Sequence, residues 1–236
     1  MRALLFGATG MIGQGVLREC LRDPSITAVR TIGRSPSPLQ HGKLTEIVRA
    51  DLFHYEDIAA QITGFDACFF CLGVSSSQVN AAEYERLTYT LTLAAAEALA
   101  RLNPEMAFVF VSGTGADSSE QGRVGWARVK GKTENAVLRL PFRAAFVVRP
   151  AMIEPAHGEQ SRTPVYRVLY KVLKPLLPLL RRLFPNYAAT TAELGRAMIY
   201  VAQRGAAKRV LESADIRVCV NLAAASDVRS PWQGGL

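Results

Sequence analysis

Three glycines near the start of the chain have the spacing of a phosphate-binding turn. The stretch "LLFGATGMIGQGVLREC" has a G-x-x-G-x-x-G pattern between an apolar run and a helical one. The first glycine permits a tight turn, the second lets the backbone approach a pyrophosphate, and the third lets the helix pack on the strand. The helix N-terminus then directs free N–H groups and a positive dipole end at the phosphates. The residues expected to line this dinucleotide site are Gly7, Thr9, Gly10, Met11, Ile12 and Gly13.

The end of the second apolar run indicates which dinucleotide binds. An acidic residue at this point would bind the ribose 2′-hydroxyl of NAD. Residues 24–45 contain no Asp or Glu, and Arg34 and Ser35 follow the run instead. A guanidinium there can fork onto a 2′-phosphate. NADP is therefore favoured over NAD, the alternative being that Arg34 is a solvated loop charge.

The ends of two later apolar runs place more residues at the same edge. Asp51 and Leu52 follow the third run, in "RADLF", where the adenine ring of a dinucleotide would lie. Leu72 and Gly73 lie at the end of the fourth run, in "CLGVSS". Ligands of open α/β sheets bind outside the carboxyl ends of the strands. These residues are therefore further candidates for cofactor contacts.

The elements that must hold these residues alternate between short apolar runs and helical stretches. Strands are predicted at 2–7, 27–33, 44–50, 66–73, 106–113 and 143–150. Helices are predicted at 11–22, 54–62, 79–101 and 125–139. Continuous apolar runs are typical of strands buried on both faces of a parallel sheet. The alternation predicts an α/β fold, a Rossmann-type doubly wound parallel sheet with helices on both faces.

The chain of 236 residues is expected to form one NAD(P)-binding domain over residues 1–218. After residue 150 the pattern changes to helices and loops, and residues 151–189 are interpreted as a small helical substrate region that caps the site. The last residues, 219–236, are predicted to be a disordered tail.

The motifs together resemble those of the short-chain dehydrogenase/reductase superfamily, in its atypical or extended branch. Over residues 1–155 the expected order is met by "GATGMIG", "GRS", "ADL", "CLGV", "VSGTGA" and "RPAMIEP". The stretch 190–205 looks like the helix that such proteins place after their substrate region. In outline the chain is similar to NAD(P)-binding proteins of the epimerase/dehydratase-like kind and to the Tat-interacting oxidoreductase group. The resemblance adds Pro150 and Ile153, in "RPAMIEP", to the expected cofactor contacts.

The resemblance also implies a Ser–Tyr–Lys active site. Ser112 matches the serine after the fifth strand, and Lys130 matches the lysine on the next helix. The tyrosine should lie one turn before the lysine, where the lysine's charge would lower the tyrosine's pKa and make it an acid/base. This chain has Trp126 there, and an indole N–H donates a hydrogen bond but does not give up its proton near neutral pH.

Two functions remain open at this point. In the first, the protein is an NADP-dependent oxidoreductase or epimerase/dehydratase-like enzyme with a degenerate active site. Its proton would come from water or from one of four side chains, namely Tyr84, Tyr89, His157 and Tyr187. In the second, it binds NADP(H) without turnover, as a redox sensor or partner-binding regulator. This would resemble the nitrogen-repression type of regulator on the same fold. Lys130 would then hold only the nicotinamide ribose, and Trp126 would be a packing residue.

The positive charge of the chain is concentrated in one segment. The net charge is +8 with a pI of about 9.6, and residues 160–192 carry six basic residues and no acid. The apolar and basic stretch 165–184 predicts either a pair of short helices that close the substrate cleft or a weak contact with an anionic membrane surface. Nucleic-acid binding is not favoured, because it does not explain a dinucleotide site at the N-terminus.

The cysteines indicate neither a disulfide framework nor a metal site. There are four, Cys20, Cys68, Cys71 and Cys219, at irregular spacing. The pair in "CFFC" lies in an apolar run, and residues i and i+3 of a strand point to opposite faces. Free cysteines fit a reducing compartment, and a cytoplasmic location is expected.

No apolar run is long enough to predict a membrane-spanning helix. The substrate is expected to be a small molecule, whose identity the sequence does not reveal.

Overall fold

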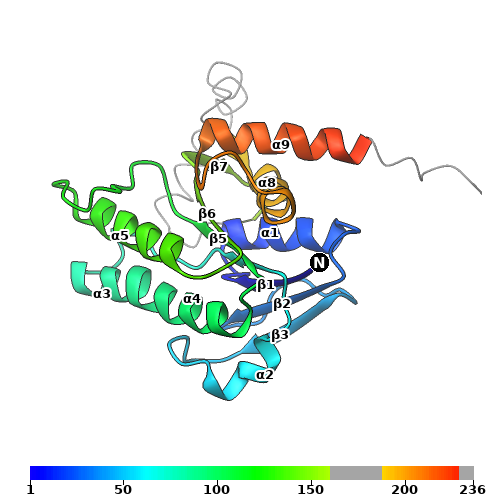
Figure 1. The fold of residues 1–236 in the computed structure, drawn as a ribbon, viewed down its shortest axis with the longest axis horizontal. Coiled ribbons are helices and arrows are strands. Elements are labelled where there is room, and N and C mark those ends of the chain that lie inside the picture. Colours follow the sequence, from blue (N-terminus) through cyan, green and yellow to red (C-terminus); the bar gives the residue numbers. More distant parts are fainter. Residues whose placement is uncertain (160–187, 229–236) are drawn as a thin grey trace, which may run out of the picture.

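A seven-stranded parallel sheet forms the centre of the molecule, in a computed structural model that describes residues 1–159 and 188–228 (Figure 1). The strands lie in the order β3-β2-β1-β4-β5-β6-β9. Their bounds are β1 Arg2–Phe6, β2 Ala28–Gly33, β3 Leu44–Val48, β4 Ala67–Phe70, β5 Ala107–Val111, β6 Ala144–Arg149 and β9 Val210–Glu212. A separate parallel pair joins β7 (Met152–Glu154) to β8 (Ala188–Thr190). The predicted Rossmann-type fold is confirmed.

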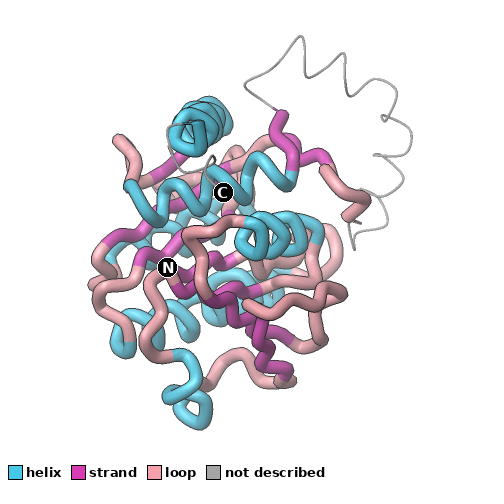
Figure 2. Tube along the Cα trace, turned by 90° about the vertical axis from the view of Figure 1, so that its right-hand side faces the viewer, coloured by secondary structure: helices cyan, strands magenta, loops and turns pink. Residues whose placement is uncertain are grey.

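Helices cover both faces of the sheet. One face carries α1 (Met11–Arg22), α8 (Thr191–Arg204) and α9 (Ser213–Val228). The other carries η1 (Glu56–Ile58), α2 (Ala59–Ile62), α3 (Ala81–Glu85), the π-helical turn η2 (Arg86–Thr90), α4 (Leu91–Leu102) and α5 (Gly125–Arg139). Figure 2, turned by 90°, shows the strands running through the middle of the molecule between these helices.

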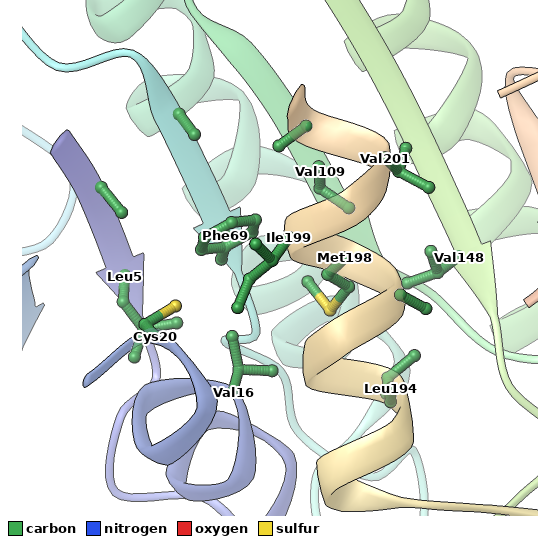
Figure 3. Packing of buried hydrophobic residues seen from close by; sticks show 14 of the residues in the cluster. Leu5, Val16, Cys20, Phe69, Val109, Val148, Leu194, Met198, Ile199 and Val201 are labelled. Carbon is green, nitrogen blue, oxygen red and sulfur yellow. The ribbon is translucent and has the colours of Figure 1, made fainter. Parts of the chain in front are cut away.

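Each face has its own hydrophobic core, because successive strand residues point to opposite sides. Leu5 and Phe69 face the core under α1 and α8, whereas their neighbours Phe6 and Phe70 face the core under α4 and α5. In Figure 3, Met198 of α8 lies over the strands in the first of these cores. The second core contains stacked phenylalanines, with 5.0 Å between the ring centroids of Phe6 and Phe70.

Local signals explain where α8 begins and ends. Thr190 and Glu193 form a capping box, in which each side chain bonds the other residue's backbone N–H. The helix ends at Gly205, which has a φ of 77°, a conformation that favours glycine. The predicted helix at 190–205 is therefore confirmed, and it packs tightly against α1 through Gly15, whose missing side chain leaves room for Thr191.

Three sequence predictions are corrected by the structure. Strand β9 was missed, because its three residues are too few to show a period. The helix predicted at 79–101 contains the π-helical turn η2, which propensities do not predict. The tail predicted at 219–236 begins too early: α9 continues to residue 228, and Cys219 is buried against the sheet.

The prediction for the cysteines is confirmed, whereas the predictions for the basic segment after β7 fall outside the described residues. Cys68 and Cys71 pack against opposite cores, as the strand period predicted, and all four cysteines are free. The stretch 165–184, Tyr187 and residues 229–236 lie outside the described residues. Within the described part of the chain, no helix combines the length and the apolar character needed to cross a membrane.

The contact between α1 and α8 gives the first testable prediction. A Cβ at Gly15 would overlap the side chain of Thr191 and come within 3.0 Å of its carbonyl carbon. We expect Gly15→Ala to lower the free energy of unfolding by about 1–3 kcal/mol, because two helix backbones would have to separate. Urea unfolding followed by circular dichroism measures this. Gly42→Ala is the control, since no atom lies within 4 Å of a Cβ there; equal losses in both variants would contradict the prediction.

Candidate functional site

The strand order reverses between β1 and β4, and the chain is shaped for close approach at that point. Gly7 follows β1 with a φ of 81°, and a Cβ on it would lie 2.7 Å from the carbonyl oxygen of Cys71, which follows β4. The N–H of Cys71 donates to Phe6 O at 3.0 Å, so the two strand ends are held together. Ligands of doubly wound sheets bind in the crevice at such a switch point.

The glycine turn presents the N-terminus of α1 to this crevice. The N–H of Gly10 donates to Gly7 O at 3.0 Å, and a Cβ at Gly13 would overlap that same oxygen. The helix has Gly10 as N-cap, with no side-chain cap and no acidic residue in its first turn. The amides of Met11 and Ile12 have no acceptor within the helix. The turn is therefore an open anion site. Gln14 Nε2 stabilises the turn by donating to Thr9 O at 3.1 Å.

Arg34 and Asp51 lie at the ends of β2 and β3, as predicted. Arg34 is exposed and has no ion-pair partner among the residues that the structure describes. Asp51 is also exposed, but its carboxylate accepts from the Phe53 N–H at 2.7 Å and lies 2.7 Å from Nδ1 of His54. The Phe53 N–H and then the His54 ring hold the pKa of Asp51 below its usual range.

The other predicted cofactor residues fall into two groups. Leu72 is half-buried and Gly73 is exposed, so both have surface at the carboxyl end of β4. Leu52, Pro150 and Ile153 are buried, Leu52 and Ile153 in the two separate cores. The last three residues therefore offer little surface to a ligand.

The hydroxyl groups after β5 are turned toward the protein itself. Ser112 Oγ donates to a carboxylate oxygen of Glu134 on α5. Thr114 Oγ1 donates to the carbonyl oxygen of Arg149 at 3.1 Å. Both hydroxyl protons are therefore committed to groups within the chain, and only the oxygen lone pairs remain for a ligand.

Glu134 and Arg149 form a buried ion pair that the sequence did not reveal. Glu134 has no exposed surface, and Nε of Arg149 lies 3.1 and 3.2 Å from its two oxygens. Arg149, at the end of β6, also donates to Glu212 of β9 at 2.9 Å and to Ser118 at 2.6 Å. The signal that could have found Glu134 is its position one turn after Lys130, on the same helix face.

Lys130 differs from Lys132 and Glu134 on the same helix, because no described residue forms a hydrogen bond or an ion pair with its ammonium. The ammonium lies 5.3 Å from the centre of the Phe110 ring, and the side chain is half-buried. Burial lowers the pKa of Lys130 to about 8, and the nearby Glu134 carboxylate opposes that shift.

Trp126 packs on the loop after β5. Its ring lies against Gly115, which has a φ of 89°, and a Cβ at that glycine would be 3.3 Å from the indole Cη2. The side chain remains 37% exposed. The tryptophan therefore occupies the position one turn before Lys130 as a packing group that still faces solvent.

The four proposed proton donors are not all near this site. Tyr84 is buried, and its burial raises the pKa of the phenol. Tyr89 lies under the ammonium of Lys132, 4.2 Å from its ring centre. His157 contacts Arg22 at the far end of α1, about 16 Å along the helix from the glycine turn. Tyr187 lies outside the described residues.

The fold and the glycine turn define a dinucleotide-binding protein of Rossmann type. A family model described as NAD(P)H-binding matches residues 7–145, more than half of the chain. The chain therefore belongs to the NAD(P)H-binding family, in the atypical or extended branch of the short-chain dehydrogenase/reductase superfamily, and the resemblance seen in the sequence is confirmed.

Curated relatives and solved structures agree with this assignment. Protein fmp52, mitochondrial, of Emericella nidulans is 30% identical over 67% of this chain and 69% of its own. Protein FMP52, mitochondrial, of Meyerozyma guilliermondii is 25% identical over 86% and 85%. The solved structure of MoeE5 with UDP-glucose and NAD superposes with a TM-score of 0.65 at 17% identity, covering 90% of this chain and 75% of that one. WbmF of Bordetella bronchiseptica, with NAD+, gives 0.66 at 13%, covering 94% and 77%.

These relatives correct the prediction of location. The cysteine usage led to an expected cytoplasmic location, whereas the relatives from Emericella nidulans and Meyerozyma guilliermondii are both named mitochondrial proteins. The prediction was wrong, because free cysteines indicate only a reducing environment and do not distinguish one such compartment from another.

The buried ion pair gives the second testable prediction. Arg149→Met would leave the Glu134 charge buried without its main partner, and we expect a loss of about 3–5 kcal/mol in the free energy of unfolding. The control is Glu212→Gln, which removes the charge of the other carboxylate that binds Arg149. Glu212 has a side chain that is 46% exposed, so its loss should cost less than about 1 kcal/mol. Chemical denaturation of both variants measures the difference, and a larger loss for Glu212→Gln would refute it.

Proposed function

We propose that the protein is an NADP(H)-dependent oxidoreductase or epimerase/dehydratase-like enzyme with an altered proton relay. The observation that carries the proposal is the open N-terminus of α1 behind a glycine turn into which any side chain would intrude. The first-turn amides would hold the pyrophosphate, and Lys130 would reach the nicotinamide ribose. A bound nicotinamide supplies hydride chemistry, and the chain supplies position and charge.

Arg34 supports NADP as the preferred dinucleotide. Its guanidinium is exposed directly after β2, where an NAD-binding protein of this fold places an acid. It is not engaged by any described carboxylate, so it is available to a 2′-phosphate. MoeE5 and WbmF were solved with NAD. At their low identity to this chain, the similarity concerns the fold alone and does not indicate which dinucleotide this chain binds.

Titration with four dinucleotides tests this preference. We expect NADPH and NADP to quench tryptophan fluorescence at lower concentration than NADH and NAD. Arg34→Ala should raise the dissociation constant for NADPH about tenfold and leave that for NADH unchanged, because one charge-assisted contact is lost. Arg30→Ala is the control, since Arg30 lies on β2 but its side chain donates to Thr45 of β3 at 3.0 Å. Equal affinity for NADPH and NADH in the unaltered protein would contradict the preference.

A second candidate function is supported by the same region. The indole of Trp126 does not release its proton near neutral pH, and the hydroxyl hydrogen of Ser112 is already hydrogen-bonded to Glu134. A protein that binds NADP(H) without turnover, and signals the redox state of the bound dinucleotide to a partner, would need neither a proton donor at position 126 nor a free Ser112 hydroxyl. This alternative predicts dinucleotide binding with no consumption of carbonyl substrates.

Restoring the tyrosine distinguishes the two candidates. Trp126→Tyr places a phenol one turn before Lys130, whose charge would lower the pKa of that phenol. We expect carbonyl reduction to rise by about 100-fold, the lower end of the range for general acid catalysis. Trp126→Phe is the control, because it keeps an aromatic ring against Gly115 without a proton. An unchanged and negligible rate in both variants, with NADPH still bound, would favour the sensor.

A further inference from the structure

We infer that Lys130 itself is the proton donor of the site, in place of the tyrosine that the chain lacks. The inference rests on the proposed oxidoreductase function and names the group that function leaves open. The lysines of this fold ordinarily assist a tyrosine one turn away, but here the nearest ring is an indole. Of the described side chains on that helix face, Lys130 is the one that can release a proton near neutral pH and has no hydrogen-bond partner.

The position of Lys130 follows from Glu134 and Ser112. Lys130 and Glu134 are one turn apart on α5 and share a face. Glu134 accepts from Ser112, which directly follows β5, so this face of α5 looks onto the carboxyl edge of the sheet. The ammonium of Lys130 stands 5.3 Å from the Phe110 ring, and Phe110 lies on β5 two residues before Ser112. The lysine is therefore held over the strand end at which ligands of this fold bind.

The charged groups on α5 and on the described elements packed against it either have other partners or face solvent. Glu134 is bound by Arg149 from β6. On α3, Glu85 lies 2.7 Å from Lys132, and on η2 the ring of Tyr89 lies under the same lysine. Glu97 and Arg101 on α4 are exposed on the outer surface of that helix.

An ammonium that is half-buried without a directly bound carboxylate loses more hydration than the distant Glu134 charge offsets, which favours release of its proton. Burial accordingly lowers the pKa of Lys130 to about 8. Such a group is charged at pH 7 and still gives up a proton readily, as efficient general acids do. Lys132, two residues on, has its pKa raised by the hydrogen bond to Glu85 and is the natural comparison.

The proposed step balances with a carbonyl substrate and a reduced nicotinamide dinucleotide. The dinucleotide supplies a hydride to the carbonyl carbon. Lys130 donates one proton to the carbonyl oxygen, so the C=O group becomes an alcohol and the ammonium becomes a neutral amine. Water returns the proton to the amine after the alcohol leaves. Ser112, whose own proton is held by Glu134, can accept a hydrogen bond from the new hydroxyl.

The test combines a rate with a direct titration of the lysine. The probe is phenanthrenequinone, an activated aromatic dicarbonyl, reduced in a single turnover by protein loaded with NADPH. Lys130→Arg keeps the charge but cannot give up a proton. We expect it to bind NADPH by fluorescence and to reduce the probe about 100-fold more slowly. In the unaltered protein the rate should fall as the pH rises above about 8, because the amine form has no proton to donate. Lys132→Arg should match the unaltered protein.

Competitive acetylation with acetic anhydride, read by mass spectrometry, measures the titration without any turnover. We expect Lys130 to become reactive around pH 8 and Lys132 only at higher pH. A Lys130→Arg protein that keeps the full rate, or a Lys130 that titrates like an ordinary lysine at about 10.4, would overturn the donor role alone. NADPH binding without any reduction by the unaltered protein would overturn the proposed function, and the donor role with it.

Discussion

A carboxylate with no exposed surface needs its charge compensated within the protein, and Glu134 meets this need through Arg149. The pair joins α5 to the end of β6. Through Glu212 the same arginine reaches β9, and through Ser112 the carboxylate reaches the end of β5. The carboxyl ends of these strands and the helix beside them are therefore fixed by one set of charges.

The chemistry of the site depends on this arrangement. Because Glu134 is satisfied by Arg149 and Ser112, it does not pair with Lys130 one turn away. The lysine keeps its donor hydrogens and loses only hydration. The serine, in contrast, keeps its oxygen lone pairs free, because its hydroxyl hydrogen is already hydrogen-bonded to the Glu134 carboxylate. A site that lost its tyrosine thus has a donor and an acceptor that differ from those the family pattern implies.

The sequence predicted the parts of the fold that follow from periodicity and from glycine chemistry. The apolar runs located the strands from β1 to β6 within a few residues, and the glycine turn lies at the switch point as expected. β9 was not predictable, because three residues are too few to show an alternation of apolar and polar side chains. The strand forms through its pairing with β6, which is distant in the sequence. The orientation of Ser112 was not predictable either, since a residue's position in a motif does not say whether its hydroxyl will donate a hydrogen bond to Glu134.

Strand β9 has a consequence for the order in which the chain is made. It pairs in parallel with β6, which ends at residue 149, although β9 itself begins only at residue 210. A parallel crossover of this length closes late, because distant segments must meet before their contacts stabilise them. During synthesis β6 is therefore an open edge with unpaired backbone groups, the kind of edge that invites association with other chains. Once β9 has formed, it covers this edge of β6 and brings Glu212 to the buried arginine.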